Sequence, residues 1–346
     1  MIKKGYFIKA PLLVVGLLFV GSSFALRQDL ITQPCFEKLT ILTCPIGNGN
    51  PNVIGGHFAV TRSLLAGLRK LNVNFNYNPR SINEVGDVVY VVCDANAVKQ
   101  CIPLRKIGII KKLLAGPNLM VRSNEFNNIL ASPEIDTYIV NSDWTVQAYI
   151  DDQPSLKDRI QVWYAGIDEN YWQPISTDNS ATKKVIVYWK NETEQFCVQV
   201  EDILKKNGWS PIRLRYGAHK QQEFKNALLN AAFCVFISRS ESQGIALAES
   251  WAMNVPTIVW DPQEPCMIEG KACWPHSAAP YLNKASGISW RNLEELEEIL
   301  KRLPYMLSTF SPRAWVLRNM TDEISVQVLL QVINSEPNAK IRTIID

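Results

Sequence analysis

Two glutamates, Glu241 and Glu249, lie on either side of Gly244 in the segment 238–249. Ionised carboxylates accept hydrogen bonds, and two of them near one another can bind several hydroxyl groups, as a sugar or a ribose requires. A glycine between them would let the backbone approach a ligand closely, because it has no side chain. The pattern therefore indicates a binding site for a hydroxyl-rich molecule.

The backbone of the same segment is suited to phosphate. The segment follows an apolar, strand-like run at 234–237 and leads into a helical pattern at 245–253. Ligands of open α/β sheets bind beyond the carboxyl ends of the strands, and free N–H groups at a helix start attract anions. A purely structural alternative remains, in which Ser240 or Ser242 caps the helix and Glu241 faces its positive end.

Alternating strands and helices must position these groups. Strands are predicted at 39–42, 73–77, 88–93, 138–140, 185–189, 212–216, 234–237 and 255–260. Helices are predicted at 60–68, 144–150, 196–207, 223–231, 245–253 and 293–303, with one long closing helix at 316–333. This alternation predicts an α/β protein with doubly wound parallel sheets.

The length of 346 residues corresponds to two domains of about 100–200 residues each. We predict one α/β domain at 35–165 and a second at 183–310, a linker at 166–182, and a closing helix with a tail at 311–346. The linker is placed where the chain becomes polar and contains Pro, Ser, Asp and Asn.

The first residues have the pattern of a targeting segment. Three lysines precede an apolar run at 10–20, and a small-residue site ends at Ala25. The pattern predicts a signal peptide at 1–25. The uncharged stretch 10–26 approaches the length of a membrane span, so a signal anchor that associates with the membrane is the alternative. Both predict an exported or membrane-anchored protein rather than a cytoplasmic one, because the positive residues stay inside.

Composition limits the partners. The net charge is only +3 and the basic residues are spread along the chain, so we expect no nucleic acid partner. No cysteine pair has C-x-x-C metal or redox spacing, and no metal site is predicted. Disulfides are possible between Cys266 and Cys273, which share one loop, and between Cys35 and Cys44.

The three histidines provide few groups for acid–base chemistry. His57 follows Gly55 and Gly56, and it could contact a sugar or an acceptor or could simply begin a helix with a local hydrogen bond. His219 is a weaker candidate at a strand end. His276 lies in a proline-rich loop, and we expect it on the surface.

The segment 238–249 resembles the Glu-x7-Glu signature of glycosyltransferase family 4, usually written S-x-x-E-G-F-G-L-x-x-x-E. Its fixed positions are occupied here by Ser238, Glu241, Gly244, Ile245 and Glu249. Further short motifs of the family occur along residues 39–333, in the same order as in the family. They are Gly55-Gly56, Gly116-Pro117-Asn118, Gly166-Ile167-Asp168 with Trp172 and Pro174, and Ala252, Val255, Pro256 and Thr257. An ordered set is more specific than any one short motif.

The resemblance implies a GT-B architecture, in which two Rossmann-like domains face each other across a cleft. The C-terminal domain would bind a nucleotide-sugar donor, with Glu241 on the transferred sugar and Glu249 on the ribose. The amides of Gln243, Gly244 and Ile245 would face the diphosphate, and Gly55 and Gly56 would approach the donor from the other domain. Such enzymes usually retain the anomeric configuration and use no metal or other cofactor. The acceptor, a glycan, a lipid or a protein, is not indicated.

The chain departs from the family pattern at two places. The family has an arginine after the first C-terminal strand and a lysine about five residues later. Here Lys190 follows the strand, but 191–195 contains no cation. Lys190 could bind phosphate or could be a solvated lysine at a strand end. Ser242 and Gln243 replace the usual Gly-Phe, which predicts a more polar sugar pocket.

Two functions therefore remain open. The first is a glycosyltransferase in which Glu241 and His57 act on the sugar and Lys190 assists in binding the donor. The second is a non-catalytic GT-B-like protein that binds a glycan or a nucleotide. An epimerase is disfavoured, because those enzymes usually use histidines in the cleft and this chain has few.

Overall fold

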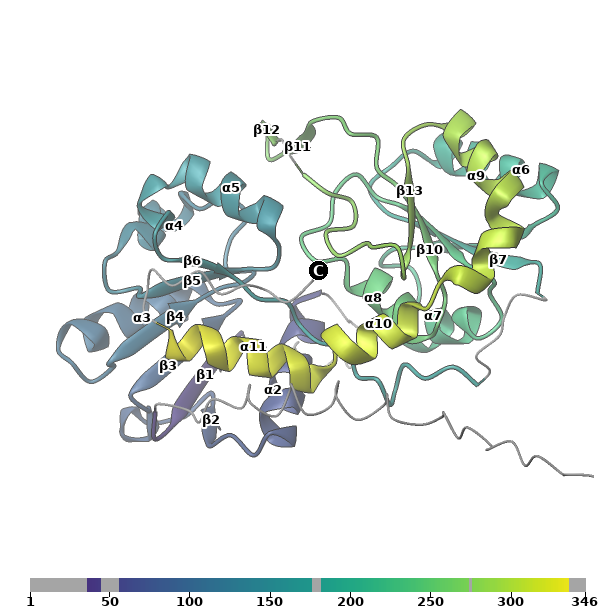
Figure 1. The fold of residues 1–346 in the computed structure, drawn as a ribbon. Helices are drawn as coiled ribbons and strands as arrows, with labels where there is room; N and C mark the ends of the chain where they lie inside the picture. The colour runs from purple at the N-terminus through teal and green to yellow at the C-terminus, as the bar shows by residue number, and fades with distance from the viewer. Residues whose placement is uncertain (1–35, 45–55, 176–181, 274–275, 336–346) are drawn as a thin grey trace, which may run out of the picture. The chain divides into compact units, whose positions relative to one another are not determined.

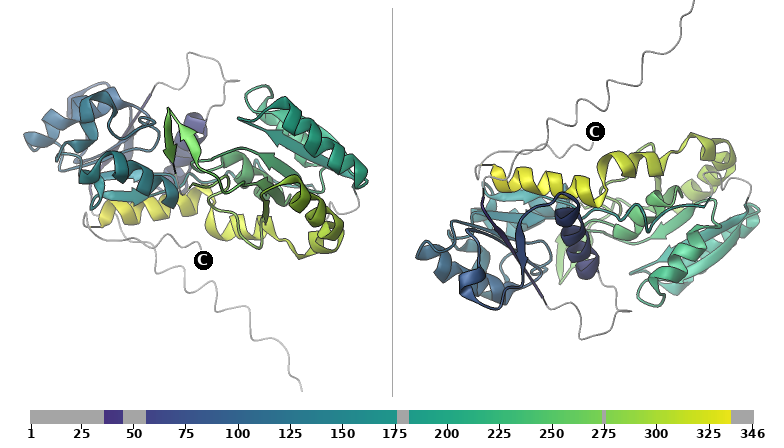
Figure 2. Two further views of the ribbon diagram at one scale, coloured as in Figure 1. Left: turned by 90° about the horizontal axis from the view of Figure 1, so that it is seen from above. Right: turned by 90° about the horizontal axis from the view of Figure 1, so that it is seen from below.

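The computed structural model describes residues 36–44, 56–175, 182–273 and 276–335, which belong to one compact unit. They form two parallel sheets with helices packed around them and one small hairpin (Figures 1 and 2). The predicted signal or anchor at 1–25 lies outside the described residues, as does Gly55. In the described ranges, no helix combines the length and the apolar composition needed to cross a membrane.

The N-terminal sheet has six strands in the order β2-β1-β3-β4-β5-β6, and all neighbours are parallel. The strands are β1 (Leu39–Thr43), β2 (Phe75–Tyr77), β3 (Val88–Val92), β4 (Lys112–Ala115), β5 (Thr137–Val140) and β6 (Ile160–Val162). The helices are α2 (Gly56–Lys70), α3 (Ala95–Lys106), α4 (Glu125–Asn128) and α5 (Asp143–Asp152), with 3-10 turns at Ile82–Glu84, Ile129–Ala131 and Pro154–Leu156. β3 and β5 are buried along their whole length, as expected for interior strands of a parallel sheet.

The C-terminal sheet has five parallel strands in the order β13-β10-β9-β7-β8. The strands are β7 (Lys184–Trp189), β8 (Ser210–Arg215), β9 (Cys234–Ile237), β10 (Thr257–Trp260) and β13 (Gly287–Trp290). The helices are α6 (Glu194–Lys206), α7 (Gln221–Leu228), α8 (Ile245–Ala252) and α9 (Leu293–Met306), followed by a 3-10 turn at Leu307–Thr309. The strands β11 (Cys266–Ile268) and β12 (Lys271–Cys273) form a separate antiparallel hairpin.

Local sequence explains where several helices begin. Thr193 accepts a hydrogen bond from the amide of Phe196 at 3.3 Å and so caps α6, and Glu194 adds a negative charge to its first turn. Asn292 caps α9 in the same way, by accepting from the amide of Glu295 at 2.9 Å. The helices predicted at 196–207 and 293–303 are confirmed within the usual margin at their ends.

The prediction of one closing helix at 316–333 is wrong. The chain forms α10 (Pro312–Asn319) and α11 (Asp322–Asn334), with a break between them. Thr321 adopts an extended conformation there, and its side chain accepts from the amide of Ile324 at 3.3 Å. This N-cap starts a new helix, which lies beside α2 (Figure 1). The apolar periodicity continues across the break, which explains why it predicted a single helix.

Close backbone contacts hold α11 in place. A Cβ on Gly67 would lie 2.3 Å from the backbone carbonyl oxygen of Asp322, and a Cβ on Gly166 would lie 2.5 Å from the Cα of Asp322. Both positions therefore require glycine. The Trp163 indole N–H donates to the Ser325 carbonyl at 2.9 Å. The start of α11 is therefore fixed against both α2 and the segment that follows β6.

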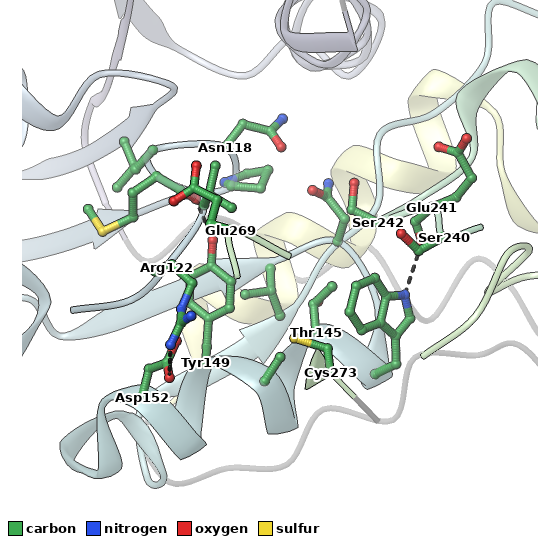
Figure 3. A pocket seen from close by; sticks show the side chains of 18 of the residues that line it. Asn118, Arg122, Thr145, Tyr149, Asp152, Ser240, Glu241, Ser242, Glu269 and Cys273 are labelled. Atoms are coloured by element: carbon green, nitrogen blue, oxygen red, sulfur yellow. Dashed lines mark hydrogen bonds and ion pairs between the residues drawn. The ribbon is translucent and has the colours of Figure 1, made fainter. Parts of the chain in front are cut away.

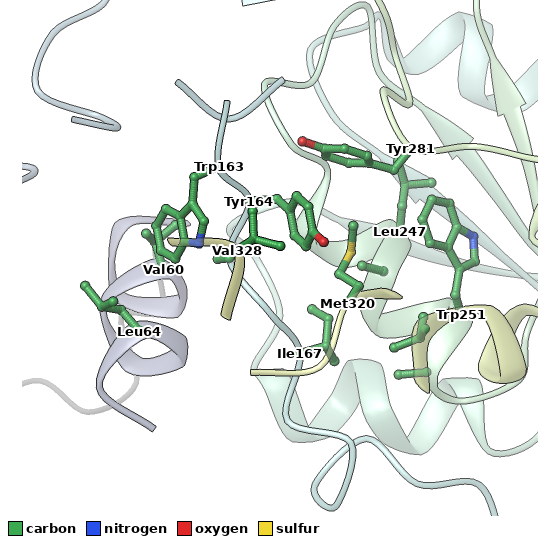
Figure 4. Packing of buried hydrophobic residues seen from close by; sticks show 14 of the residues in the cluster. Val60, Leu64, Trp163, Tyr164, Ile167, Leu247, Trp251, Tyr281, Met320 and Val328 are labelled. Carbon is green, nitrogen blue, oxygen red and sulfur yellow. The ribbon is translucent and has the colours of Figure 1, made fainter. Parts of the chain in front are cut away.

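A large apolar cluster continues from α2 to α8. Figure 4 shows Trp163 between Val60 and Val328, and Met320 lies near Ile167 in the same view. All five side chains are buried. Burial of each such side chain contributes about 1.5–3 kcal/mol, so this cluster is a main source of stability for the unit.

Candidate functional site

The chain order in the C-terminal sheet reverses between β7 and β9. β7 has β8 on one side and β9 on the other, with Trp189 directly opposite Ile237. The amide of Lys190 donates to the Ile237 carbonyl at 2.8 Å. Lys190 and the segment 238–249 therefore leave the sheet side by side at this switch point, where open α/β sheets bind their ligands.

Lys190 and Glu241 form an ion pair at this edge. Lys190 Nζ lies 2.9 and 3.0 Å from the two Glu241 carboxylate oxygens, and Ser238 Oγ donates to the same carboxylate at 3.0 Å. The side chains of the pair are 21% and 16% exposed. Lys190 Nζ also lies 4.7 Å from the centre of the Tyr216 ring. Lys190 is thus paired and mostly shielded from water, rather than extended into solvent.

Gly244 begins helix α8 in a left-handed conformation, with φ of +79°. A Cβ at this position would lie 2.7 Å from Leu247 Cδ1, so a side chain is excluded by both the backbone conformation and the packing. The first N–H groups of a helix have no acceptor within it. The backbone of Gly244, Ile245 and Ala246 lines a cavity, so this helix start can receive an anion.

Glu249 lies inside α8 and is only 8% exposed. Burial raises the pKa of its carboxyl group to about 7, although the hydrogen bond from Gln221 and the charge of Arg62 oppose the shift. Gln221 Nε2 donates to Glu249 Oε1 at 3.2 Å. The carboxyl group is therefore partly protonated near neutral pH, and it can both donate and accept hydrogen bonds.

Gln243 makes its contacts away from the helix start. Its side chain is 5% exposed, and its Nε2 donates to the Ala165 carbonyl at 2.7 Å. Its Oε1 accepts from the Ala165 amide at 2.9 Å and from Asn141 Nδ2 at 3.4 Å. The polar replacement at this position thus binds the segment that follows the N-terminal sheet. We call this pair of bonds between Gln243 and Ala165 the clasp.

Glu241 and Glu249 line one cavity of about 530 Å³, which we call the glutamate cavity. It also contains Gly56 and His57 from the start of α2, and Lys190, Gly244 and Ile245 from the other half. Of the described residues that line it, Lys190 is the only lysine or arginine. The structure therefore brings together all the described residues that the sequence predicted for the site, and it supplies no second cation there.

A larger cavity of about 780 Å³ adjoins it, which we call the hairpin cavity because β11 and β12 line it. Six residues line both cavities: His57, Asn118, Asn141, Lys190, Glu241 and Ser242. In Figure 3, Arg122, Tyr149 and Asp152 lie on one side of the hairpin cavity, and Ser240, Glu241 and Ser242 lie on the other. The Trp144 indole N–H donates to the Glu241 carbonyl at 2.9 Å.

Two of the three histidines line the cavities, whereas the third is buried elsewhere. His57 lines both cavities, and burial lowers its pKa, so its ring is neutral at pH 7. His219 lines the glutamate cavity, with Nδ1 2.8 Å from the Arg215 carbonyl. The surface position predicted for His276 is wrong, since it is only 7% exposed and its Nε2 contacts the Glu264 carbonyl. The fold packs its proline-rich loop against the protein, which loop composition does not reveal.

The two cysteines of the hairpin are neighbours that no disulfide joins in this structure. Cys266 and Cys273 are directly opposite each other across β11 and β12, and both are free thiols. The second possible pair includes Cys35, which lies outside the described residues, and Cys44, which is a free thiol.

Several residues of the site were not predicted. Asn118 follows β4, Asn141 follows β5, and Gln221 begins α7. The motif Gly116-Pro117-Asn118 was recognised as a family mark, and its position at a strand end could have placed Asn118 in the site. Nothing in the local sequence distinguishes Asn141 or Gln221 from an ordinary loop or helix residue.

Several solved structures of GT-B proteins are similar to this chain. The Anabaena protein HepE in complex with UDP and glucose is 13% identical, with a TM-score of 0.53 over 85% of this chain and 99% of its own. Sucrose-phosphate synthase from Thermosynechococcus elongatus is 11% identical, with a TM-score of 0.55 over 84% of this chain and 97% of its own. The lipopolysaccharide outer core galactosyltransferase WaaB, in its apo form, is 12% identical, with a TM-score of 0.52 over 86% and 98% of the two chains.

These similarities establish the GT-B fold, with two parallel-sheet α/β domains. No protein-family model matches the chain, and no curated protein sequence matches it. The resemblance to glycosyltransferase family 4 therefore remains a prediction.

Proposed function

We propose that this protein is a glycosyltransferase that transfers a sugar from a nucleotide-sugar donor to an acceptor. The observation that carries the proposal is that Glu241 and Glu249 line one cavity on either side of the start of helix α8. This arrangement combines two hydroxyl-binding carboxyl groups with an anion-binding helix start, as a nucleotide-sugar requires. Two proteins of the same fold support the proposal, because one is named a galactosyltransferase and the other was solved in complex with UDP and glucose.

Each group has a distinct role in this proposal. The diphosphate binds at the amides of Gly244 and Ile245 and beside Lys190, and the ribose hydroxyls bind Glu249. Glu241 contacts the transferred sugar, and His57 approaches it from the other half of the protein. The leaving diphosphate is stabilised by the helix dipole and by Lys190, which is electrostatic catalysis. We further propose that transfer retains the anomeric configuration and uses no metal.

Donor binding and transfer test this function. The wild-type protein is screened against nucleotide-sugars by thermal shift, because a ligand that binds only the folded state raises the melting temperature. The donor that binds is then incubated with wild-type protein and Glu241→Gln, and release of the nucleotide is measured. We expect Glu241→Gln to reduce release by about 100-fold, in the range typical for removing one electrostatic catalytic contact. Glu294→Gln, an exposed substitution on α9, should leave it unchanged.

One observation favours a second function, namely binding without transfer. Lys190 is the only cation that lines the described glutamate cavity, and Glu241 already neutralises it. A diphosphate leaving group would therefore receive little positive charge. If nucleotides raise the melting temperature but the wild-type protein never releases sugar or nucleotide from a donor, the non-catalytic function is correct.

We also propose that the segment 1–25 is a signal peptide or a signal anchor, with membrane association through 10–26 in the second case. The protein would then be exported or membrane-anchored, in a compartment that supplies nucleotide-sugars. N-terminal sequencing of the mature protein tests this proposal. A start near Leu26 supports cleavage, whereas a start at Met1 together with fractionation into the soluble cytoplasm contradicts both forms.

A further inference from the structure

The proposed donor leaves the hairpin cavity without an assigned occupant. This cavity adjoins the glutamate cavity, and Lys190, Glu241 and Ser242 line both. A molecule in the hairpin cavity would therefore reach the carboxylate that contacts the transferred sugar. A volume of about 780 Å³ is in the range of sites that enclose a small organic ligand.

Carboxylates already bind every lysine and arginine that lines the described hairpin cavity. Arg122 donates to both oxygens of Asp152, at 2.5 and 2.6 Å. Lys271, on the hairpin, lies 2.5 Å from the same carboxylate, and Lys190 pairs with Glu241 at 2.9 Å. The Asp152 side chain is only 7% exposed, whereas the side chains of Arg122 and Lys271 are 19% and 43% exposed. An anionic ligand would have to compete with these partners.

Two further carboxylates make the cavity negative. Asp151 and Glu269 line it together with Asp152 and Glu241, so four carboxylates face three cations. His57 contributes no positive charge, because burial lowers its pKa. The net charge therefore disfavours a phosphate, a sulfate or a carboxylate in this cavity.

The remaining lining is uncharged and combines polar, aromatic and aliphatic groups. The polar residues include Asn118, Asn141, Thr145, Ser240 and Ser242, the aromatic ones include Trp144 and Tyr149, and the aliphatic ones include Leu119, Met120 and Val121. Amide and hydroxyl groups can pair with the hydroxyls of a ligand, and aromatic rings cover its apolar faces. This combination suits an uncharged sugar.

We propose that the hairpin cavity binds the acceptor, and that the acceptor is a hydroxyl-rich glycan that carries no anionic group. The assignment of an acceptor rests on the proposed transferase function. The chemical class of the ligand rests on the cavity alone, namely on its paired cations, its surplus carboxylate and the hydroxyl and amide groups of its uncharged lining. Anionic glycans are excluded as preferred ligands.

Binding of matched probes to the full-length protein tests the ligand class. The probes are neutral oligosaccharides built from glucose, galactose and N-acetylglucosamine, each with a counterpart that is sulfated at one hydroxyl. Saturation-transfer NMR identifies the probes that bind, and titration gives their affinities. We expect a neutral probe to bind at least about fivefold more tightly than its sulfated counterpart, from repulsion of about 1 kcal/mol.

A charge change in the cavity should alter this preference. Asp151 is exposed at the last turn of α5, where a lysine is favoured by the helix dipole, so Asp151→Lys should fold normally. We expect this variant to reduce the preference for the neutral probe to about twofold or less, because it reverses one charge of the lining. Asp158→Lys makes the same charge change at an exposed position that lines neither cavity, and it should leave the preference unchanged.

A bulky side chain placed in the hairpin cavity tests whether the neutral probe binds there. Ala148 lines only the hairpin cavity, so Ala148→Trp should reduce binding of the neutral probe by at least about tenfold, which is on the order of 1.4 kcal/mol. Nucleotide binding, measured by thermal shift, should remain and also shows that the variant is folded. Should Ala148→Trp not fold, Asp151→Lys decides the matter by itself.

Three results would overturn the inference: tighter binding of the sulfated probe by the wild-type protein, no binding of any neutral probe, or an unchanged preference in Asp151→Lys. Failure of the proposed function looks different. In that case no nucleotide-sugar binds or reacts, whereas the neutral probes still bind and still respond to Asp151→Lys.

Discussion

At the scale of single residues, the site depends on how charges are neutralised. Lys190 and Glu241 pair at the edge between the two cavities, and Asp152 binds both Arg122 and Lys271. Lys190 must therefore exchange at least part of its contact with Glu241 for a phosphate when a donor binds. This exchange reduces the affinity that the lysine can provide, because the ion pair is already favourable before binding.

Glu249 carries a prediction about pH. The pKa of its carboxyl group is about 7 in the folded protein, above the value of about 4.3 for an unfolded glutamate. The folded state therefore binds a proton more readily, and the free energy of unfolding falls as the pH rises from about 4.3 to 7. Glu249→Gln removes this dependence. Between pH 5 and pH 8, we expect the free energy of unfolding of the wild type to fall by on the order of 2–3 kcal/mol relative to that of the variant.

Urea unfolding of the wild type and of Glu249→Gln, at pH 5 and at pH 8, measures this difference in the free energy of unfolding. Glu294→Gln, on the surface of α9, serves as the control and should follow the wild type at both pH values. An equal response of Glu249→Gln and wild type to pH would show that the Glu249 carboxyl group is not desolvated in the folded protein.

At the scale of elements, Gly244 determines how β9 connects to α8. Its φ of +79° and the proximity of Leu247 place the start of the helix beneath the glutamate cavity. Gly208 has the same φ of +79° after α6, but a Cβ there would meet no atom within 4 Å. Substitution of each glycine by alanine therefore separates the cost of the left-handed backbone from the cost of the overlap with Leu247.

We expect Gly208→Ala to lower the free energy of unfolding by about 1–2 kcal/mol, the cost of a left-handed conformation with a Cβ. Gly244→Ala should lower it by a further 1–3 kcal/mol or so, because the Cβ also overlaps Leu247. Chemical denaturation measures both values. Thermal shift with nucleotide should show that Gly244→Ala loses binding and that Gly208→Ala keeps it. Equal stabilities would mean that the packing at Gly244 relaxes without cost.

At the scale of the whole molecule, polar contacts join the two halves in addition to the apolar cluster that runs from α2 to α8. The clasp links Gln243 to Ala165, Trp144 donates to the Glu241 carbonyl, and α11 returns to pack beside α2. These contacts involve residues that are far apart in the sequence. They place the segment 238–249 at the same cavity as the start of α2, so the site depends on the assembled protein.

The clasp gives a prediction at this scale. Gln243→Ala leaves the buried N–H and C=O of Ala165 without these partners, and each such group costs about 1–3 kcal/mol. We expect the variant to lose about 2–4 kcal/mol of stability. Hydrogen exchange at the Ala165 amide should also become faster than in wild type. Ser242→Ala, at the exposed neighbouring position, should change neither measurement.

Sequence alone determined the fold class and the position of the candidate site. The helices at 196–207 and 293–303 and the buried strands were predictable, because apolar periodicity and capping residues act over a few neighbours. The strand β4 was not predicted, because the segment 106–114 mixes basic and apolar residues without a clear period. The helix α3 was not predicted either, and it contains Pro103, a residue that normally ends a helix. The order of the family marks indicated where the two carboxylates would meet.

Only the tertiary structure decided which partner each of these residues has. The ion pair of Lys190 with Glu241, the clasp of Gln243 with Ala165, and the burial of His276 all result from contacts between distant parts of the chain or from packing around a loop. The break between α10 and α11 has the same origin, because the apolar pattern is continuous there and the helix start is fixed by Thr321 and by packing on α2. Local sequence rules describe neighbours, whereas burial, pKa and ion pairing depend on which surfaces the folded chain brings together.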